Sequence, residues 1–191
     1  MDLNGYKWIV SRLNGGVMVF DEGDPAISSD DRSIQLNQSN TEMTSNDVRT
    51  VEVDLDGDVW VGTSEGPIVF ECGSSIFDGT CKGSRRKVDQ DGIIYYLLSS
   101  EVITSIAVDG ANRKWFGTSN NGIYVQSPGG EIQIYNFNIA NSPLMDNNIL
   151  DISIDPKTGQ AWIATAQGLQ VFRSDATQAK DFFTETASVF P

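Results

Sequence analysis

An acidic stretch, Asp54-Leu55-Asp56-Gly57-Asp58, is the part of the sequence that most resembles a metal-binding loop. Calcium loops place oxygen ligands at alternating positions, as these aspartates are placed. The corresponding stretch Gly110-Ala111-Asn112-Arg113 lacks the acids. Asp-Gly is also a favoured turn pair between antiparallel strands. We therefore interpret the stretch as a hairpin turn and predict no metal site.

Histidine is absent from all 191 residues. Its absence removes the commonest general base near neutral pH, the commonest metal ligand and every His-containing catalytic triad. The sequence shows no other pairing of a nucleophile with a base. We therefore expect no catalytic residues and no cofactor.

The basic run Ser84-Arg85-Arg86-Lys87 contains the candidate ligand-binding residues Arg85, Arg86 and Lys87. Guanidinium and ammonium groups could contact an anionic glycan or an acidic partner. The alternative is a solvated loop whose cations offset nearby acids. Tyr95, Tyr96, Tyr124, Tyr135 and Phe137 could stack on sugars, or they could be half-buried packing residues of strands.

Cys72 and Cys81 are the two cysteines, and they lie in an insertion rich in Gly and Ser. They could form a disulfide that closes a small loop in an oxidising compartment. They could also be two unrelated thiols. Two thiols without histidine cannot complete a tetrahedral zinc site.

The formal net charge of −13 argues against nucleic acid as a partner, because such a surface repels phosphate. No run approaches the roughly 18–20 apolar residues of a membrane span. The opening Met1-Asp2-Leu3-Asn4-Gly5 is not a signal peptide and already lies in the first repeat, so it predicts no location.

A repeated unit must position all these residues. Its centres, Trp8, Trp60, Trp115 and Trp162, are 52, 55 and 47 residues apart. Each unit has Asp, a polar turn, Trp, a patch of small residues, Gly and an apolar run. The four copies are DLNGYKWIVSRLNGGVMVF (2–20), DLDGDVWVGTSEGPIVF (54–70), DGANRKWFGTSNNGIYV (109–125) and DPKTGQAWIATAQGLQVF (155–172).

Period-two alternation predicts a strand before the Asp of three units, in 48–54, 102–109 and 149–155. The Trp lies on a second strand and the apolar run is a third. Weaker fourth strands are expected at 34–37, 93–97 and 132–135. Gly62 and Gly117, two positions after Trp, would let a neighbouring sheet approach closely.

Antiparallel four-stranded units that recur every 40–50 residues or so are typical of β-propeller blades. We therefore predict an all-β fold, a β-propeller fragment of about four four-stranded antiparallel blades. The four tryptophans are expected to be structural, as apolar plates between blades.

Residues 1–175 are expected to form this partial propeller. Residues 176–191 would be a last-blade strand or a linker to a further C-terminal domain. Four blades are few for a closed ring, so we expect a part of a larger propeller. Its open blade edges could also pair in a homodimer.

The stretch NSPLMDNNILDISIDPKTGQAWIATAQGL (141–169) resembles the two-component-regulator propeller repeat, and SNDVRTVEVDLDGDVWVGTSEG (45–66) does too. Leu144, Ile149, Asp155, Trp162 and Gly168 take consensus positions. The insertion 71–98 and the repeat that follows it resemble the PorZ-type propellers of the type IX secretion system. This resemblance covers nearly the whole chain.

The PorZ-type resemblance implies a non-catalytic, extracytoplasmic module at the outer membrane surface or in the periplasm. Its partners would be other secretion-system proteins or anionic lipopolysaccharide, and its role the processing and attachment of secreted cargo. The repeat also occurs in periplasmic sensor regions of hybrid two-component proteins, which gives a ligand-sensing region as the alternative.

An enzyme of the glycosidase or quinone-dependent propeller class is the remaining alternative. The stretch from Asp155 to Trp162 is similar to a quinone-docking motif, but only one unit of the four contains its Thr-Gly. A sialidase-like site would need three convergent arginines, and arginine is scarce here. We therefore predict that the protein is not an enzyme.

Overall fold

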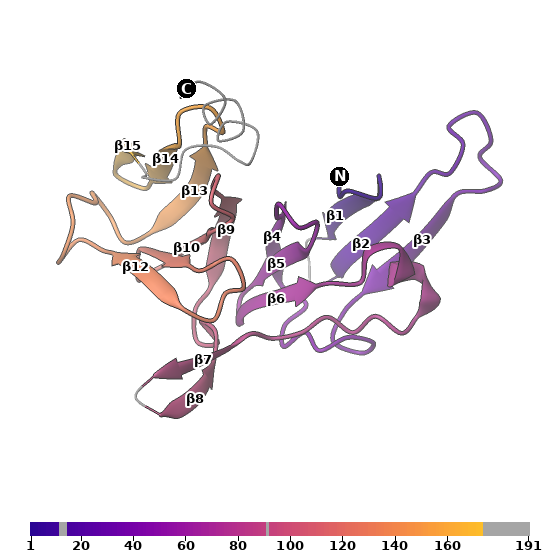
Figure 1. The fold of residues 1–191 in the computed structure, drawn as a ribbon, viewed down its shortest axis with the longest axis horizontal. Helices are drawn as coiled ribbons and strands as arrows, with labels where there is room; N and C mark the ends of the chain where they lie inside the picture. Colours follow the sequence, from indigo (N-terminus) through magenta and orange to yellow (C-terminus); the bar gives the residue numbers. More distant parts are fainter. Residues whose placement is uncertain (12–14, 91, 174–191) are drawn as a thin grey trace, which may run out of the picture.

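The computed structural model describes residues 1–11, 15–90 and 92–173 (Figure 1). These residues form fifteen β-strands and one short 3-10 helix, and the strands pair in antiparallel order. No helix in the described ranges is long and apolar enough to cross a membrane. The all-β prediction is confirmed.

Four sheets follow one another along the chain, one for each Trp-centred repeat. In every sheet, strands adjacent in sequence are adjacent in space. Their members are β1 (Lys7–Ser11), β2 (Gly16–Asp21) and β3 (Arg32–Leu36); β4 (Val48–Val53), β5 (Val59–Thr63) and β6 (Gly66–Phe70); β9 (Ile103–Val108), β10 (Lys114–Thr118), β11 (Ile123–Gln126) and β12 (Gln133–Phe137); and β13 (Ile149–Ile154), β14 (Gln160–Thr165) and β15 (Gly168–Arg173).

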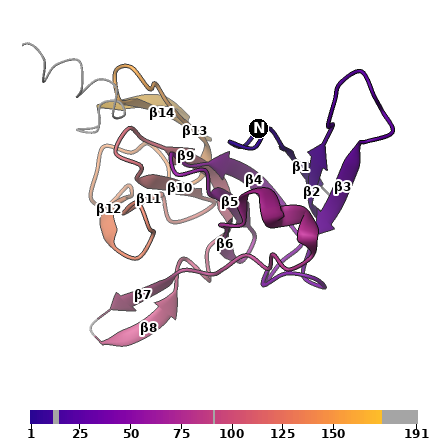
Figure 2. The same cartoon turned by 45° about the vertical axis from the view of Figure 1, so that its right-hand side comes forward.

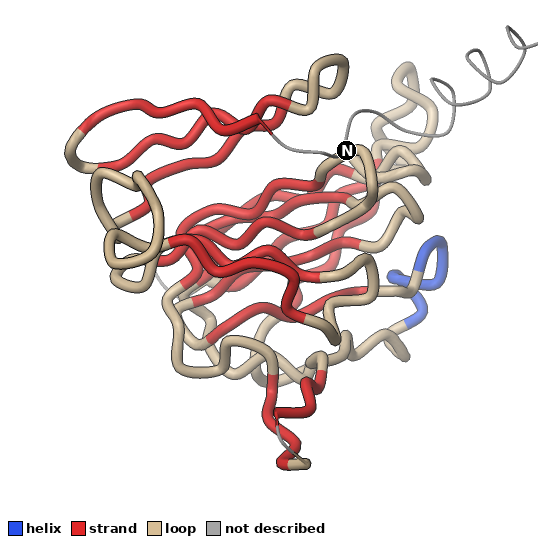
Figure 3. Tube along the Cα trace, turned by 60° about the vertical axis from the view of Figure 1, so that its left-hand side comes forward, coloured by secondary structure: helices blue, strands red, loops and turns tan. Residues whose placement is uncertain are grey.

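The sheets stack face to face, as blades do in a propeller (Figures 2 and 3). Strands β1, β4, β9 and β13 form the same edge of successive sheets, and each lies beside the next. Three apolar clusters fill the spaces between sheets. Val17 and Val61 belong to the first cluster, Trp60 and Phe116 to the second, and Trp115 with Ile149 to the third. The hydrophobic core is therefore divided among the interfaces between sheets.

Close approach between sheets depends on the glycine two positions after Trp, as predicted. A Cβ on Gly62 would lie 2.7 Å from Cγ2 of Ile103 in the next sheet. A Cβ on Gly117 would lie 2.6 Å from Cγ2 of Ile149 in the sheet after that. Such distances are shorter than carbon–carbon contact allows, so a side chain at either position would push two sheets apart.

The outer strands differ in part from the expected four per sheet. In the described ranges only the third sheet has four strands, and the first, second and fourth have three. The fourth strand expected at 93–97 is β8 (Ile93–Tyr96), which pairs with β7 (Lys87–Gln90) in a separate hairpin. Ser84 instead bridges to Val69 at the outer edge of β6. The segment 176–191, expected to be a last-blade strand or a linker, lies outside the described residues.

The β7–β8 hairpin projects away from the four sheets (Figures 1 and 3). It belongs to the insertion 71–98, whose first part contains the short helix η1 (Gly73–Asp78). All four residues of β8 are exposed. The insertion, including this hairpin, is thus the main departure from a plain stack of blades.

Candidate interaction surface

The Asp of each repeat organises the turn between the first and second strands. Oδ1 of Asp54 accepts hydrogen bonds from the backbone N–H groups of Asp56 and Asp58, both at 3.0 Å. Its Oδ2 accepts the indole N–H of Trp60 at 3.0 Å. A single carboxylate therefore closes the turn and orients the Trp, which accounts for the six-residue spacing between the two.

The same geometry recurs in two other repeats. Trp8 donates to Asp2 at 2.8 Å, and Trp115 donates to Asp109 at 2.9 Å. In the fourth repeat the Asp-to-Trp spacing is seven residues, and Oδ2 of Asp155 accepts from the hydroxyl of Thr158 instead. Within the stretch 54–58, the Asp54 carboxylate thus organises the turn, and the Asp56 carboxylate accepts from the side chain of Asn112 in the next sheet.

Asp54 also forms a buried ion pair with the next sheet. Nζ of Lys114 lies 2.8 Å from Oδ2 of Asp54, and the Lys114 side chain is fully buried. The ammonium also donates to the backbone carbonyls of Asn112 and Pro128. Burial opposes ionisation of Asp54, but the hydrogen bonds from Lys114 and Trp60 outweigh it and hold the pKa of this carboxyl below its usual range.

Each of the first three tryptophans contacts a phenylalanine of the following sheet. The ring centroids of Trp8 and Phe70 are 5.5 Å apart, and those of Trp60 and Phe116 are 5.8 Å apart. Trp115 and Phe172 are likewise 5.8 Å apart. Trp162, on the last described sheet, is 43% exposed. The tryptophans therefore join successive sheets, and one face of the last sheet is open among the described residues.

The insertion is held by a disulfide between Cys72 and Cys81. This loop carries Ile76, which is buried, and Phe77, whose ring makes an edge-to-face contact with Tyr6 at 5.1 Å. Tyr6 precedes β1, so the insertion packs against the first sheet although it leaves from the second.

We expect reduction of this disulfide to lower the free energy of unfolding by about 2–3 kcal/mol, because the closed loop restricts the unfolded chain. Urea unfolding with and without reductant measures the loss. A Cys72→Ser/Cys81→Ser double variant is the control, since it should match the reduced protein and ignore the reductant. Identical curves for oxidised and reduced wild type would contradict the expectation.

The basic run 84–87 is divided between two environments. Both terminal nitrogens of Arg86 donate to Glu71, with a shortest distance of 2.6 Å, and its guanidinium lies 5.7 Å from the Trp60 ring centroid. Hydrogen bonds from Arg86 lower the pKa of Glu71. Arg86 therefore contributes an internal ion pair.

Arg85 and Lys87 face Tyr96, whereas Arg86 contacts Glu71. The Arg85 guanidinium is 4.0 Å from the Tyr96 ring centroid, and Lys87 Nζ is 5.9 Å from it. These residues line an open cleft of about 430 Å³ together with the loop 41–44. Two cations around an exposed aromatic ring can bind an anionic group beside a sugar ring.

The other aromatic candidates do not join this cleft. Tyr135 stacks on Phe137 within β12, with ring centroids 5.4 Å apart. Tyr124 packs against the cluster between the second and third sheets. Tyr95 is exposed on β8. The candidate interaction surface therefore consists of Arg85, Lys87 and Tyr96.

Sequence reasoning missed the contacts that join the repeats. The sequence feature that could have indicated the Asp–Trp hydrogen bonds is the constant six-residue spacing between Asp and Trp in three units. A lysine immediately before Trp115 also precedes Trp8, where Lys7 pairs with Glu22. Only the three-dimensional stacking shows that Lys114 reaches the Asp54 of another repeat.

Comparison with solved structures gives similar proteins, whereas no protein-family model and no curated protein matches the sequence. One is PorZ of Porphyromonas gingivalis, an essential bacterial surface component of the type IX secretion system. It is 28% identical over 92% of this chain, with a TM-score of 0.81. The chain has the fold of a PorZ-type propeller. It spans 25% of the length of PorZ.

Extracellular domains of two regulators from B. thetaiotaomicron share the fold. A putative one-component system is 19% identical over 91% of this chain, with a TM-score of 0.66 and 23% of its own length covered. A putative hybrid two-component system is 22% identical over 91% of this chain, with a TM-score of 0.58 and 19% covered. Propellers of this kind thus occur in bacterial surface and extracellular domains. The propeller type that the resemblance of the repeats predicts is confirmed.

Proposed function

We propose that this chain is a non-catalytic part of an extracytoplasmic, PorZ-like propeller protein, at the outer membrane surface or in the periplasm, and that it binds proteins or glycans in type IX secretion. The observation that carries the proposal is the likeness to PorZ over 92% of the chain. The partners would be other secretion-system proteins or anionic lipopolysaccharide.

The cleft around Tyr96 supports the glycan part of the proposal. Its Arg85 and Lys87 are cations on a chain whose net charge is −13. These two cations outnumber Glu42 among the charged residues that line the cleft, and cations grouped on an acidic protein can direct an anionic ligand to one place. Stacking on Tyr96 would add contact with the sugar ring.

The first test measures binding of the protein to immobilised anionic lipopolysaccharide. Light scattering then measures the mass of the protein in solution with and without lipopolysaccharide. We expect wild type to bind and an Arg85→Ala/Lys87→Ala variant to lose about tenfold in affinity, as the loss of charge-assisted hydrogen bonds implies. The control Arg49→Ala/Lys157→Ala removes the same charge from exposed positions elsewhere and should bind as wild type. Equal loss in both variants, or no binding by wild type, would contradict the proposed glycan site.

The alternative role is a ligand-sensing region, favoured by the fold shared with two regulator domains. A monomer whose mass does not change with lipopolysaccharide would favour this role. A homodimer through the open blade edges is also proposed. A doubled mass without ligand would support that association.

A further inference from the structure

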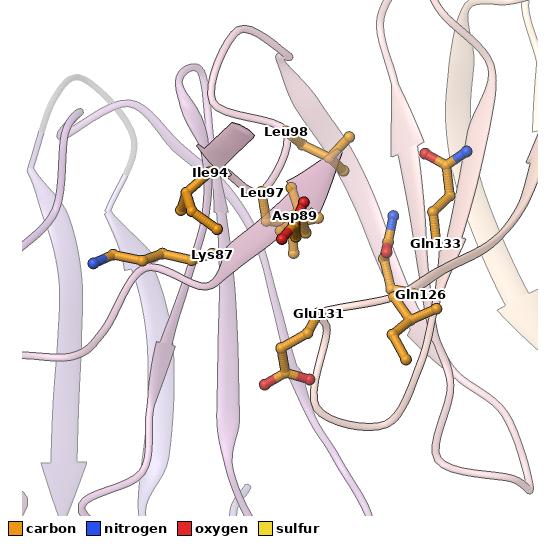
Figure 4. A pocket seen from close by; sticks show the side chains of 10 residues that line it. Lys87, Asp89, Ile94, Leu97, Leu98, Gln126, Glu131 and Gln133 are labelled. Carbon is orange, nitrogen blue, oxygen red and sulfur yellow. The ribbon is translucent and has the colours of Figure 1, made fainter. Parts of the chain in front are cut away.

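A second cavity lies between the β7–β8 hairpin and the third sheet. Its volume is about 610 Å³, and Figure 4 shows the side chains around it. The hairpin provides one wall, and β11 with the start of β12 provides the other. The cavity is distinct from the cleft around Tyr96, although the stem of Lys87 borders both.

Gln126 gives this cavity an unsatisfied hydrogen-bond acceptor. The side chain is 1% exposed, and its Oε1 has no hydrogen-bond partner among the described residues. Its amide group points from β11 toward the hairpin, into the cavity (Figure 4). Folded proteins rarely leave a buried acceptor unpaired, because the lost hydration costs about 1–3 kcal/mol. A donor supplied by a ligand would satisfy it.

Two carboxylates border the same cavity. Asp89 comes from the hairpin, where its Oδ1 accepts the backbone N–H of Gly92 at 2.8 Å, and Glu131 comes from the turn before β12. Among the described residues, Glu131 is paired with Arg86, whose Nε lies 3.9 Å from Oε1 of Glu131. The terminal nitrogens of Arg86 donate to Glu71 instead. The distance between Nε and Oε1 exceeds a hydrogen bond, so Glu131 can still accept one from a ligand.

Lys87 does not neutralise the cavity, because its ammonium lies near the Tyr96 ring. In Figure 4 its side chain extends away from Asp89 and Gln126. The polar groups that line the cavity are two carboxylates, the unpaired amide oxygen of Gln126 and the side-chain amide of Gln133. Ile94, Leu97, Leu98 and Ile132 supply an apolar wall beside them.

We propose that this cavity binds the ammonium group and methylene stem of a lysine side chain on a partner peptide. The ammonium has three donors and no acceptor, which matches the acceptors Asp89, Glu131 and Gln126. The methylenes fit the apolar wall, as lysine stems commonly lie along apolar surface. This inference goes beyond the proposed function, because it stands whether the parent protein acts in secretion or in sensing.

The test uses two capped pentapeptides, Gly-Gly-Lys-Gly-Gly and Gly-Gly-Gln-Gly-Gly, titrated into the isotopically labelled full chain and followed by NMR. We expect the lysine peptide to shift the side-chain amide of Gln126 and the β7–β8 backbone amides. The glutamine peptide should not. Binding should weaken about tenfold in Asp89→Asn/Glu131→Gln, as removal of charged hydrogen bonds implies. The control Asp31→Asn/Glu65→Gln removes equal charge at exposed positions elsewhere and should bind as wild type.

Gln126→Leu separates binding from folding. Leucine removes the unpaired acceptor, so the free energy of unfolding should stay level or rise while the lysine peptide binds more weakly. If Gln126→Leu unfolds, the Asp89→Asn/Glu131→Gln variant still tests the proposal, because its two carboxylates are exposed. The proposal would be overturned by equal shifts from both peptides or by no shift from the lysine peptide. It would also be overturned if maltose, a neutral sugar, shifted these residues and the lysine peptide did not.

Discussion

Replacing Asp54 with asparagine is expected to lower the free energy of unfolding by about 3–5 kcal/mol, as happens when one partner of a buried ion pair is removed. Asparagine keeps an oxygen that can accept the turn N–H groups. It removes the charge that balances the Lys114 ammonium, which is fully buried 2.8 Å away. The loss of stability therefore reports the contacts of Oδ2, with the Lys114 ammonium and the Trp60 indole N–H, more than the turn.

The effect should depend on pH in a defined direction. The pKa of the Asp54 carboxyl is lowered in the folded state. Its stabilising contribution is complete above the unfolded value of about 3.9 and is lost as pH falls through the lowered folded value. The difference between wild type and Asp54→Asn should thus be largest above about pH 4 and shrink below it.

Urea unfolding over a pH series measures this difference. Asp155→Asn is the matched control, because the same acid in the fourth repeat accepts from Thr158 and contacts no lysine of a following sheet in the described range. It should cost much less. A double-mutant cycle with Lys114→Met should give a large coupling energy. Additive losses, or a loss in Asp155→Asn equal to that in Asp54→Asn, would contradict the role of the pair.

The repeat pattern predicted the stacked sheets because each signal was local. Alternation in 48–54, 102–109 and 149–155 placed β4, β9 and β13 to within one residue at each end. The small residue after Trp predicted close packing between sheets, and Gly62 and Gly117 show it. These features follow from the conformation and size of residues near one another in sequence.

Pairing between distant segments was the part that could not be predicted. The run Ile93–Tyr96 has the composition of a strand, but nothing in it specifies β7 as its partner in place of β6. The basic run 84–87 likewise reads as one patch, whereas in the structure Arg86 contacts Glu71 and Arg85 and Lys87 lie beside Tyr96. The orphan acceptor of Gln126 is a property of the assembled cavity.

Trp115→Ala should lower the free energy of unfolding by about 3–5 kcal/mol, the usual cost of removing a buried aromatic ring. Trp115 is 0% exposed and contacts Phe172 of the following sheet. Trp115→Phe should cost less, because a ring still fills part of the space. The lost indole N–H would leave Asp109 with its hydrogen bond from Arg113 at 2.6 Å.

Trp162→Ala is the comparison that tests the stacking rule. Trp162 has the same place in its repeat but is 43% exposed, so its removal should cost only about 1 kcal/mol, nearer to a surface substitution. Thermal and urea unfolding of the three variants measure the order of the losses. If Trp162→Ala costs as much as Trp115→Ala, Trp162 must be covered by something other than the described strands, either another part of the protein or a second copy. The size of that loss therefore reports whether the fourth sheet has a neighbour in solution.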